Sequence, residues 1–164
     1  MLIVSERARI SDKADIEDSV RGSRIVISAG VVIDAFVKIK PVGGSGDVVI
    51  GENSYINSGT VIYSGNGVEI GSGVLIAANC TLAPVNHEFR TRNVLIAQQG
   101  FKPSRGGITI ADDVWIGAGC VILDGARIGT GCVIGALSLV KEKLEPYTIY
   151  AGNPLAKIAE RPQQ

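Results

Sequence analysis

The sequence carries no excess of either charge, because 16 lysines and arginines balance 16 aspartates and glutamates in 164 residues. A balanced chain offers no basic patch to nucleic acid or to an anionic membrane surface, so a small molecule is the expected substrate. The chain also lacks any uninterrupted apolar run of the roughly 18 residues that a membrane-spanning helix needs. Its first ten residues contain three charges and no apolar core of signal-peptide length. We therefore expect a protein without a membrane span, located in the cytoplasm.

Metal-binding side chains are equally scarce. The chain has one histidine, His87, and three cysteines. Zinc and related ions are normally held by clustered histidine, cysteine or carboxylate ligands at close spacing. A site of three histidines would need one from each of three subunits, and nothing in the sequence supports that arrangement. No metal cofactor is expected.

A branched aliphatic residue, in contrast, recurs every six residues over most of the chain. Helices and ordinary strands bury side chains about every 3.6 or 2 residues, so neither explains this period. A three-sided coil does explain it, because each hexad forms one flat side and one corner, and three hexads complete a turn of about 18 residues. Successive turns then stack as parallel strands. The repeating positions are Ile50, Ile56, Ile62, Ile70, Ile76, Leu82, Ile110, Ile116, Ile122, Ile128, Ile134 and Val140.

The residue four places after each aliphatic position tests this coil, since it also points to the axis but occupies a narrower space. Such positions hold small or β-branched side chains: Ala14, Val20, Val31, Val37, Ser54, Thr60, Val74, Cys80, Val114, Cys120, Ala126, Cys132 and Ser138. The cysteines among them are expected to pack as small buried side chains without chemistry of their own. The departures, at Gly43, Asn66, Asn86 and Leu144, fall in the third hexad of a turn and therefore share one edge of the prism.

The repeat predicts a single domain over residues 1–164. Residues 1–26 are expected to form an irregular first turn. Hexads start there at Ile10 and Ile16, and Gly22 stands where a third aliphatic residue would be expected.

Insertions leave the coil at three places. Short ones follow Ile39 and Ile62, and a polar, basic and aromatic loop of about residues 87–107 is the longest. A loop of this length is more often functional than accidental. The repeat is expected to end at Val140, and residues 141–164, which contain three prolines, are predicted to cap the open end of the coil.

His87 opens the long loop and is the candidate for chemistry. The unperturbed pKa of imidazole, about 6.5, lets it accept a proton at neutral pH. Its position at the start of the largest insertion suits a general base, and a loop histidine without a role is the alternative. Asn86, immediately before it, either shapes the corner or contacts the substrate.

Together these features resemble the hexapeptide acyltransferases. The resemblance rests on the repeat, the Asn86 and His87 pair, IADDVWIGAGCV at 110–121, IGTGCVIGALSLV at 128–140 and AGNP at 151–154. It covers nearly the whole chain and is strongest for the branch that acetylates maltose, galactosides, xenobiotics and polysaccharides. It implies an all-β fold, a single-stranded left-handed parallel β-helix with a long protruding loop and a short C-terminal tail.

The resemblance also implies a homotrimer that uses acetyl-CoA as donor, with each active site in a groove between neighbouring prisms. His87 matches the catalytic base of the family. Trp115 matches a position beside the pantetheine arm, and a subunit contact is the alternative. Gly117, Ala118 and Ala136 match backbone contacts to pantetheine, although corner geometry also explains small residues there.

Two further contacts follow from the resemblance and from the needs of the base. Lys141 and Lys157 are expected near the CoA phosphates, with a solvated charged surface as the alternative. The second imidazole nitrogen of His87 should donate to a carbonyl or carboxylate, for which Glu88 and a backbone carbonyl are the candidates. Asn86 and Glu88 are also placed near the acceptor.

The sequence thus predicts an acetyl-CoA-dependent O-acetyltransferase that acts on a sugar or glycan, as in polysaccharide or lipopolysaccharide biosynthesis, by direct transfer. Gln99 and Gly100 in the loop resemble the polysaccharide enzymes. The alternatives are an N-acetyltransferase acting on an amino-sugar nucleotide and a xenobiotic acetyltransferase of the streptogramin type. A non-catalytic trimeric β-helix scaffold is the alternative from another class.

Overall fold

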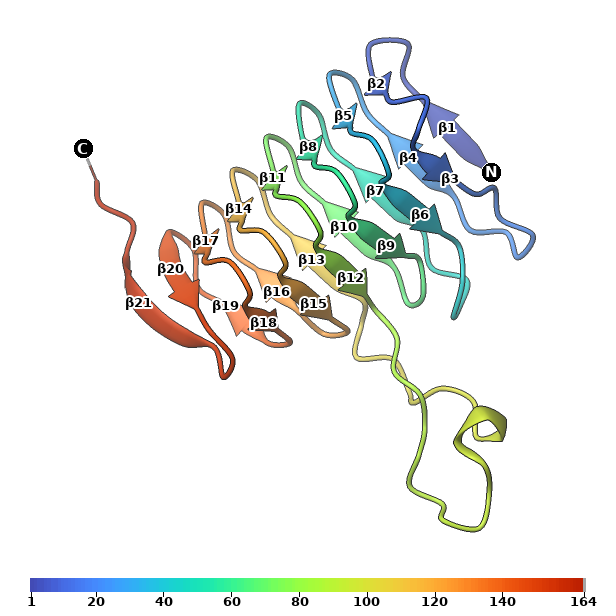
Figure 1. The fold of residues 1–164 in the computed structure, drawn as a ribbon. Coiled ribbons are helices and arrows are strands. Elements are labelled where there is room, and N and C mark those ends of the chain that lie inside the picture. The colour runs from blue at the N-terminus through green and yellow to red at the C-terminus, as the bar shows by residue number, and fades with distance from the viewer. Residues whose placement is uncertain (164) are drawn as a thin grey trace.

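Residues 1–163, which the computed structural model describes, wind as a three-sided coil of short strands (Figure 1). Successive turns add strands to three sheets, here called sheets A, B and C. This architecture confirms the predicted left-handed parallel β-helix with a long protruding loop and a short C-terminal tail. Among the described residues, no helix has the length and apolarity needed to cross a membrane.

Within each sheet the strands follow one another in chain order and run parallel, except for the last pair of sheet B. Sheet A contains β1 (Leu2–Val4), β4 (Ile25–Ile27), β7 (Val48–Ile50), β10 (Val68–Ile70), β13 (Ile108–Ile110), β16 (Arg127–Ile128) and β19 (Lys143–Leu144). Sheet B contains β2 (Arg9–Ile10), β5 (Val32–Ile33), β8 (Tyr55–Ile56), β11 (Leu75–Ile76), β14 (Trp115–Ile116), β17 (Val133–Ile134), β20 (Thr148–Ala151) and β21 (Ala156–Glu160). Sheet C contains β3 (Asp15–Ile16), β6 (Lys38–Lys40), β9 (Val61–Tyr63), β12 (Thr81–Ala83), β15 (Val121–Leu123) and β18 (Leu139–Val140).

The axial aliphatic side chains fill the coil as their period predicts. In sheet A, Ile27, Ile50, Ile70, Ile110 and Ile128 stack in register, and each is at most 3% exposed. Full burial of such a side chain stabilises the fold by roughly 1.5–3 kcal/mol. Stacked aliphatic columns are therefore the main source of stability.

The three cysteines pack in the core, as expected, and are free thiols. They also serve as hydrogen-bond donors, which the sequence did not reveal. The thiols of Cys80 and Cys120 donate to the carbonyl oxygens of Gly117 and Gly135, each at 3.2 Å. Burial raises the pKa of the Cys132 thiol. Small inward side chains thus donate to corner carbonyls, and the Gly135 carbonyl accepts the Ser138 hydroxyl as well at 2.6 Å.

The first turn differs from the expectation. The coil begins at β1, and Val4 pairs in register with Ile27. The first insertion follows Ile16, so Gly22 is not a repeat position, and Val20 is 96% exposed instead of facing the axis. Counting hexads forward from Ile16 placed the repeat across this insertion, which is why the assignment of both residues was wrong.

The coil also continues beyond Val140, where we expected it to end. Strand β19 pairs in parallel with β16, and Leu144, predicted as a departure from the small inward position, is a buried axial residue stacked on Ile128. Strand β20 then pairs in parallel with β17. Only β21 folds back, antiparallel to β20. The connection after Val140 is two residues shorter than a hexad, so the period hides this last turn.

The long loop joins β12 of sheet C to β13 of sheet A and spans residues 84–107. It projects well away from the coil and carries one short 3-10 helix, η1 (Ile96–Gln98) (Figure 1). Because it leaves the prism at the edge between sheets C and A, it lies on the side opposite sheet B. The side chains of this loop are therefore accessible to solvent or to a neighbouring molecule.

Candidate active site

His87 lies on the outgoing leg of the loop, where two legs pair as a short antiparallel stem. It forms a bridge with Phe101, and the two rings lie 4.8 Å apart between centroids, tilted by 40°. On either side of the bridge, the Glu88 N–H donates to the Gly100 carbonyl at 3.0 Å, and the Lys102 N–H donates to the Asn86 carbonyl at 2.8 Å. The imidazole is exposed, and its position is set by backbone pairing.

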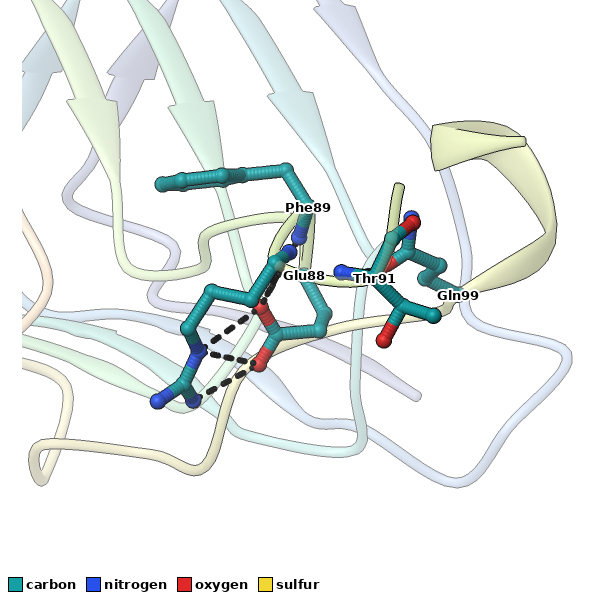
Figure 2. Close-up of polar contacts among 5 residues, drawn as sticks. Glu88, Phe89, Thr91 and Gln99 are labelled. Atoms are coloured by element: carbon teal, nitrogen blue, oxygen red, sulfur yellow. Dashed lines mark hydrogen bonds and ion pairs between the residues drawn. The ribbon is translucent and has the colours of Figure 1, made fainter. Parts of the chain in front are cut away.

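Glu88, one of the two candidates for orienting His87, does not contact the imidazole. Its carboxylate accepts hydrogen bonds from the Arg90 guanidinium at 2.8 Å and from the Phe89 N–H at 2.8 Å (Figure 2). The hydrogen bonds from Arg90 lower the pKa of Glu88 to about 2. Within residues 1–163 the imidazole has no hydrogen bond to another group, which leaves both of its nitrogens open.

Gln99 holds the outer part of the loop together. Its side-chain amide donates to the carbonyls of Thr91 and Val94 at 2.9 and 2.8 Å, and its oxygen accepts the Thr91 N–H at 3.1 Å. Figure 2 shows Gln99 beside Thr91. The loop is thus ordered by its own side chains while Leu95 and Ile96 remain 70% and 56% exposed. This tip is an apolar surface that residues 1–163 leave exposed.

Trp115 lies on the outer face of sheet B and is 54% exposed. It stacks in register between Leu75 and Val133. With Tyr55 and Leu75 it lines a shallow hollow of about 260 Å³. The loop leaves from the opposite edge of the prism, so one chain does not bring Trp115 and His87 together.

Gly117, Ala118 and Ala136 lie at the corner between sheets B and C. Gly117 is buried, its N–H donates to the Ile134 carbonyl at 2.8 Å, and its carbonyl accepts the Cys80 thiol. A side chain on Gly117 would come within 2.6 Å of the Ala136 nitrogen, so this glycine permits close stacking of turns. Ala118 and Ala136 are exposed, and their N–H groups have no partner among residues 1–163. Of these three residues, Ala118 and Ala136 therefore leave an N–H open to a ligand, and Gly117 does not.

The predicted phosphate contacts are not gathered at one place. Lys141 is exposed in the short connection from sheet C to sheet A. Lys157 lies on β21, where its ammonium contacts Glu160 at 3.1 Å. It borders a groove of about 960 Å³ that Tyr147 and Arg161 also line. The Lys157 groove is large enough for part of a ligand, and Lys141 lies at a different corner.

Asp124 is a residue of the loop region that sequence reasoning missed. It is 2% exposed and accepts backbone N–H groups from the returning leg of the loop. The signal was available, since an acidic residue follows the aliphatic segment of β15 directly. In the described chain, no group of three or more histidine, cysteine or acidic side chains is arranged to hold a metal ion.

Comparison with known proteins identifies the family. Residues 107–142 match the family described as bacterial transferase hexapeptide (six repeats), and residues 47–84 match the hexapeptide repeat of succinyl-transferase. The chain is 38% identical to galactoside O-acetyltransferase of Escherichia coli over 118 residues, which is 70% of this chain and 54% of the relative. It is 43% identical to a chloramphenicol acetyltransferase of Agrobacterium fabrum over 121 residues, or 74% of this chain and 55% of the relative. It thus spans about half the length of these curated relatives.

The fold is also similar to a solved structure over almost its whole length. That structure is a variant of AntD, an N-acyltransferase from Bacillus cereus, in complex with dTDP-4-amino-4,6-dideoxyglucose and coenzyme A. The TM-score is 0.81 at 30% identity, covering 98% of this chain and 84% of that chain. The repeat matches the family models, and the chain covers 84% of AntD at 30% identity. The chain therefore belongs to the hexapeptide-repeat acyltransferase superfamily.

Proposed function

We propose that the protein is an acetyl-CoA-dependent O-acetyltransferase that acts on a sugar or glycan, with His87 as general base. The observation that carries the proposal is the position of the only histidine. Its imidazole is exposed at the stem of an ordered, projecting loop, with both nitrogens open, in a chain of an acyltransferase superfamily. The galactoside O-acetyltransferase relative supports a sugar hydroxyl as acceptor.

The transfer is direct. His87 removes the proton from the acceptor hydroxyl as its oxygen attacks the thioester carbonyl, so that a carbon–oxygen bond forms and the carbon–sulfur bond then breaks. The imidazolium passes the proton to the departing CoA sulfur. A backbone N–H directed at the tetrahedral oxyanion would contribute on the order of 3 kcal/mol. No acyl-enzyme is required.

The active site is shared between copies in a homotrimer. Two apolar surfaces support this arrangement: the loop tip with Leu95 and Ile96, and the outer face of sheet B with Leu75 and Trp115. They lie on opposite sides of one prism and lack partners within it. Threefold repetition lets the loop of each copy meet sheet B of the next, which brings His87 to the neighbour's Trp115.

Coenzyme A would lie along the corner between sheets B and C. The free N–H groups of Ala118 and Ala136 suit the amide carbonyls of the pantetheine arm. The N–H and the carbonyl of Gly117 are already engaged, so this glycine would serve by allowing its turn to stack closely against Ala136. Lys157 or Lys141 would pair with the phosphates.

N-acylation of an amino-sugar nucleotide is the second candidate. It is favoured by the similarity to AntD, an N-acyltransferase whose structure holds an amino-sugar nucleotide and coenzyme A. The chloramphenicol acetyltransferase relative favours a xenobiotic acceptor in the same way. A general base at His87 serves hydroxyl and amine acceptors alike, so substrate preference must be measured.

The test is thiol release from acetyl-CoA with a panel of sugars, amino-sugar nucleotides and antibiotics. Acceptor-dependent release is expected, and His87→Ala should lower kcat at least about a hundredfold while circular dichroism stays unchanged. His87→Asn is the matched polar control and should be equally slow, because an amide is not a base. Unchanged turnover in both variants would remove His87 from the mechanism. Lack of release with every acceptor would favour the non-catalytic scaffold.

A further inference from the structure

Asp124 is the only buried carboxylate among residues 1–163. Burying a carboxylate is costly unless its oxygens are fully hydrogen-bonded. No lysine or arginine of the described chain forms an ion pair with Asp124. Its oxygens instead accept the backbone N–H groups of Arg105 at 2.8 Å and Gly107 at 2.9 Å, and the side-chain amide of Asn66 at 3.3 Å. All the hydrogen bonds of this buried carboxylate therefore join it to the returning leg of the loop and to Asn66.

These hydrogen bonds fix the returning leg of the loop to the coil. The Gly107 carbonyl also accepts the Gly125 N–H at 2.7 Å, and the Ile108 N–H donates to the Gly67 carbonyl at 2.9 Å. Gly107 has a φ of +75°, and a side chain on it would come within 2.5 Å of the Gly67 oxygen. The leg is therefore held on both sides in a conformation that glycine allows.

Asn66 connects the same carboxylate to the outgoing leg. Its side chain donates to Asp124, and its backbone N–H donates to the Pro84 carbonyl at 3.2 Å. His87 follows Pro84 by three residues, and Lys102, which pairs with the Asn86 carbonyl, precedes Arg105 by three. Asn66 and Asp124 thus hold both ends of the stem that carries the imidazole.

We propose that Asp124, acting with Asn66, is a positioning residue for His87. It sets the angle at which the stem leaves the coil and therefore the place of the imidazole in the neighbouring copy's groove. The inference rests on the proposed function of His87 as general base. Misplacing a reacting group by about 1 Å can slow a reaction on the order of a hundredfold, so even a small tilt of the stem matters.

The chemistry of the site explains why a carboxylate is required. An ionised carboxylate only accepts hydrogen bonds, and here both oxygens face N–H donors. Asp124→Asn keeps the shape but turns an NH₂ group toward at least one of these donors. One leg contact is then lost, although the aliphatic columns stay intact.

The experiment compares Asp124→Asn and Asn66→Ala with wild type, using Asp34→Asn as control. Asp34 is a corner carboxylate that accepts the Ala35 N–H at 2.8 Å and the Ser58 hydroxyl at 2.7 Å, away from the loop. Three quantities are measured: kcat per CoA-binding site with the KM for acetyl-CoA, the NMR signal of the single imidazole, and the rate of tryptic cleavage in the loop.

For Asp124→Asn, kcat per site should fall at least about tenfold, with the KM for acetyl-CoA changed less than about twofold. The imidazole signal should shift or broaden, and tryptic cleavage at Arg90 and Arg92 should accelerate. Asn66→Ala should change the same quantities in the same direction, and Asp34→Asn should change none of them.

An unchanged imidazole signal and an unchanged cleavage rate in Asp124→Asn would overturn the proposal, as would a kcat per site equal to that of wild type. If Asp124→Asn does not fold, Asn66→Ala decides by the same measurements. If wild type transfers no acetyl group, the proposed function fails. The imidazole signal and the cleavage rate then decide alone whether Asp124 positions the stem.

Discussion

Replacing Leu144 with alanine should lower the free energy of unfolding by about 2–5 kcal/mol, the usual cost of this truncation in a core. Leu144 is 2% exposed and stacks on Ile128 in the last turn. The substitution removes the transfer free energy of the deleted side-chain atoms. The atoms that line the remaining cavity also lose their van der Waals contacts. Strand β19 has a partner strand on one side only, so the site can partly collapse. The expected loss is therefore in the lower half of the range, about 2–3 kcal/mol.

Guanidinium denaturation at fixed protein concentration measures this loss, because the apparent stability of an oligomer depends on concentration. Leu137→Ala is the matched control, since Leu137 is nearby but 77% exposed. Its effect on the free energy of unfolding should stay within about 0.5 kcal/mol, because truncating an exposed side chain removes little buried surface. A Leu144→Ala variant no less stable than Leu137→Ala would refute the reasoning, because the coil would then end at Val140.

Three further results are expected. Gly107→Ala should lower the free energy of unfolding by more than Gly73→Ala. Both residues have positive φ, but only a side chain on Gly107 would clash with backbone. Equal losses of unfolding free energy would contradict the close packing of residue 107 against the coil. The Arg90 hydrogen bonds lower the pKa of Glu88 to about 2, so their contribution to loop order is present above the ordinary value of 4.5 and is lost as the pH falls through 2. A carboxyl NMR titration should have its midpoint near 2 and move toward 4.5 in Arg90→Ala, and a wild-type midpoint already at 4.5 would exclude the ion pair. Trp115, the only tryptophan, should fluoresce at longer wavelength when the protein is diluted to monomers. If the emission wavelength does not change as the protein dissociates, sheet B lies outside the subunit interface.

The repeating core was predictable because one residue type at one period fills one column. From the second turn on, every aliphatic position assigned from the period is buried. The prediction was wrong at both ends for a common reason: the period is interrupted after Ile16 and shortened after Val140, and a register count cannot cross a change of length. Pairing of Val4 with Ile27 and of Leu144 with Ile128 restores the register in space.

The site was less predictable because its contacts join distant parts of the chain. Asp124 and Asn66 are 58 residues apart, and the loop that they anchor lies between them. The acidic residue directly after β15 marks Asp124 as unusual, but no local pattern identifies its partner. The candidate role of Glu88 in orienting His87 is excluded for a local reason. The Arg90 guanidinium and two backbone N–H groups bind its carboxylate oxygens instead of the imidazole. His87 stays a prediction, which rests on the chemistry of imidazole and on its place at the start of the loop.

Mixing His87→Ala with Trp115→Ala subunits tests the shared active site most directly. In the proposed trimer, each parent variant lacks one of the two groups at every site. After unfolding and refolding an equal mixture, a site that takes His87 from one copy and Trp115 from the next is intact in about one case in four, so acetyl transfer should return to about a quarter of the wild-type rate. A mixture no more active than its parents would contradict an active site built from two copies.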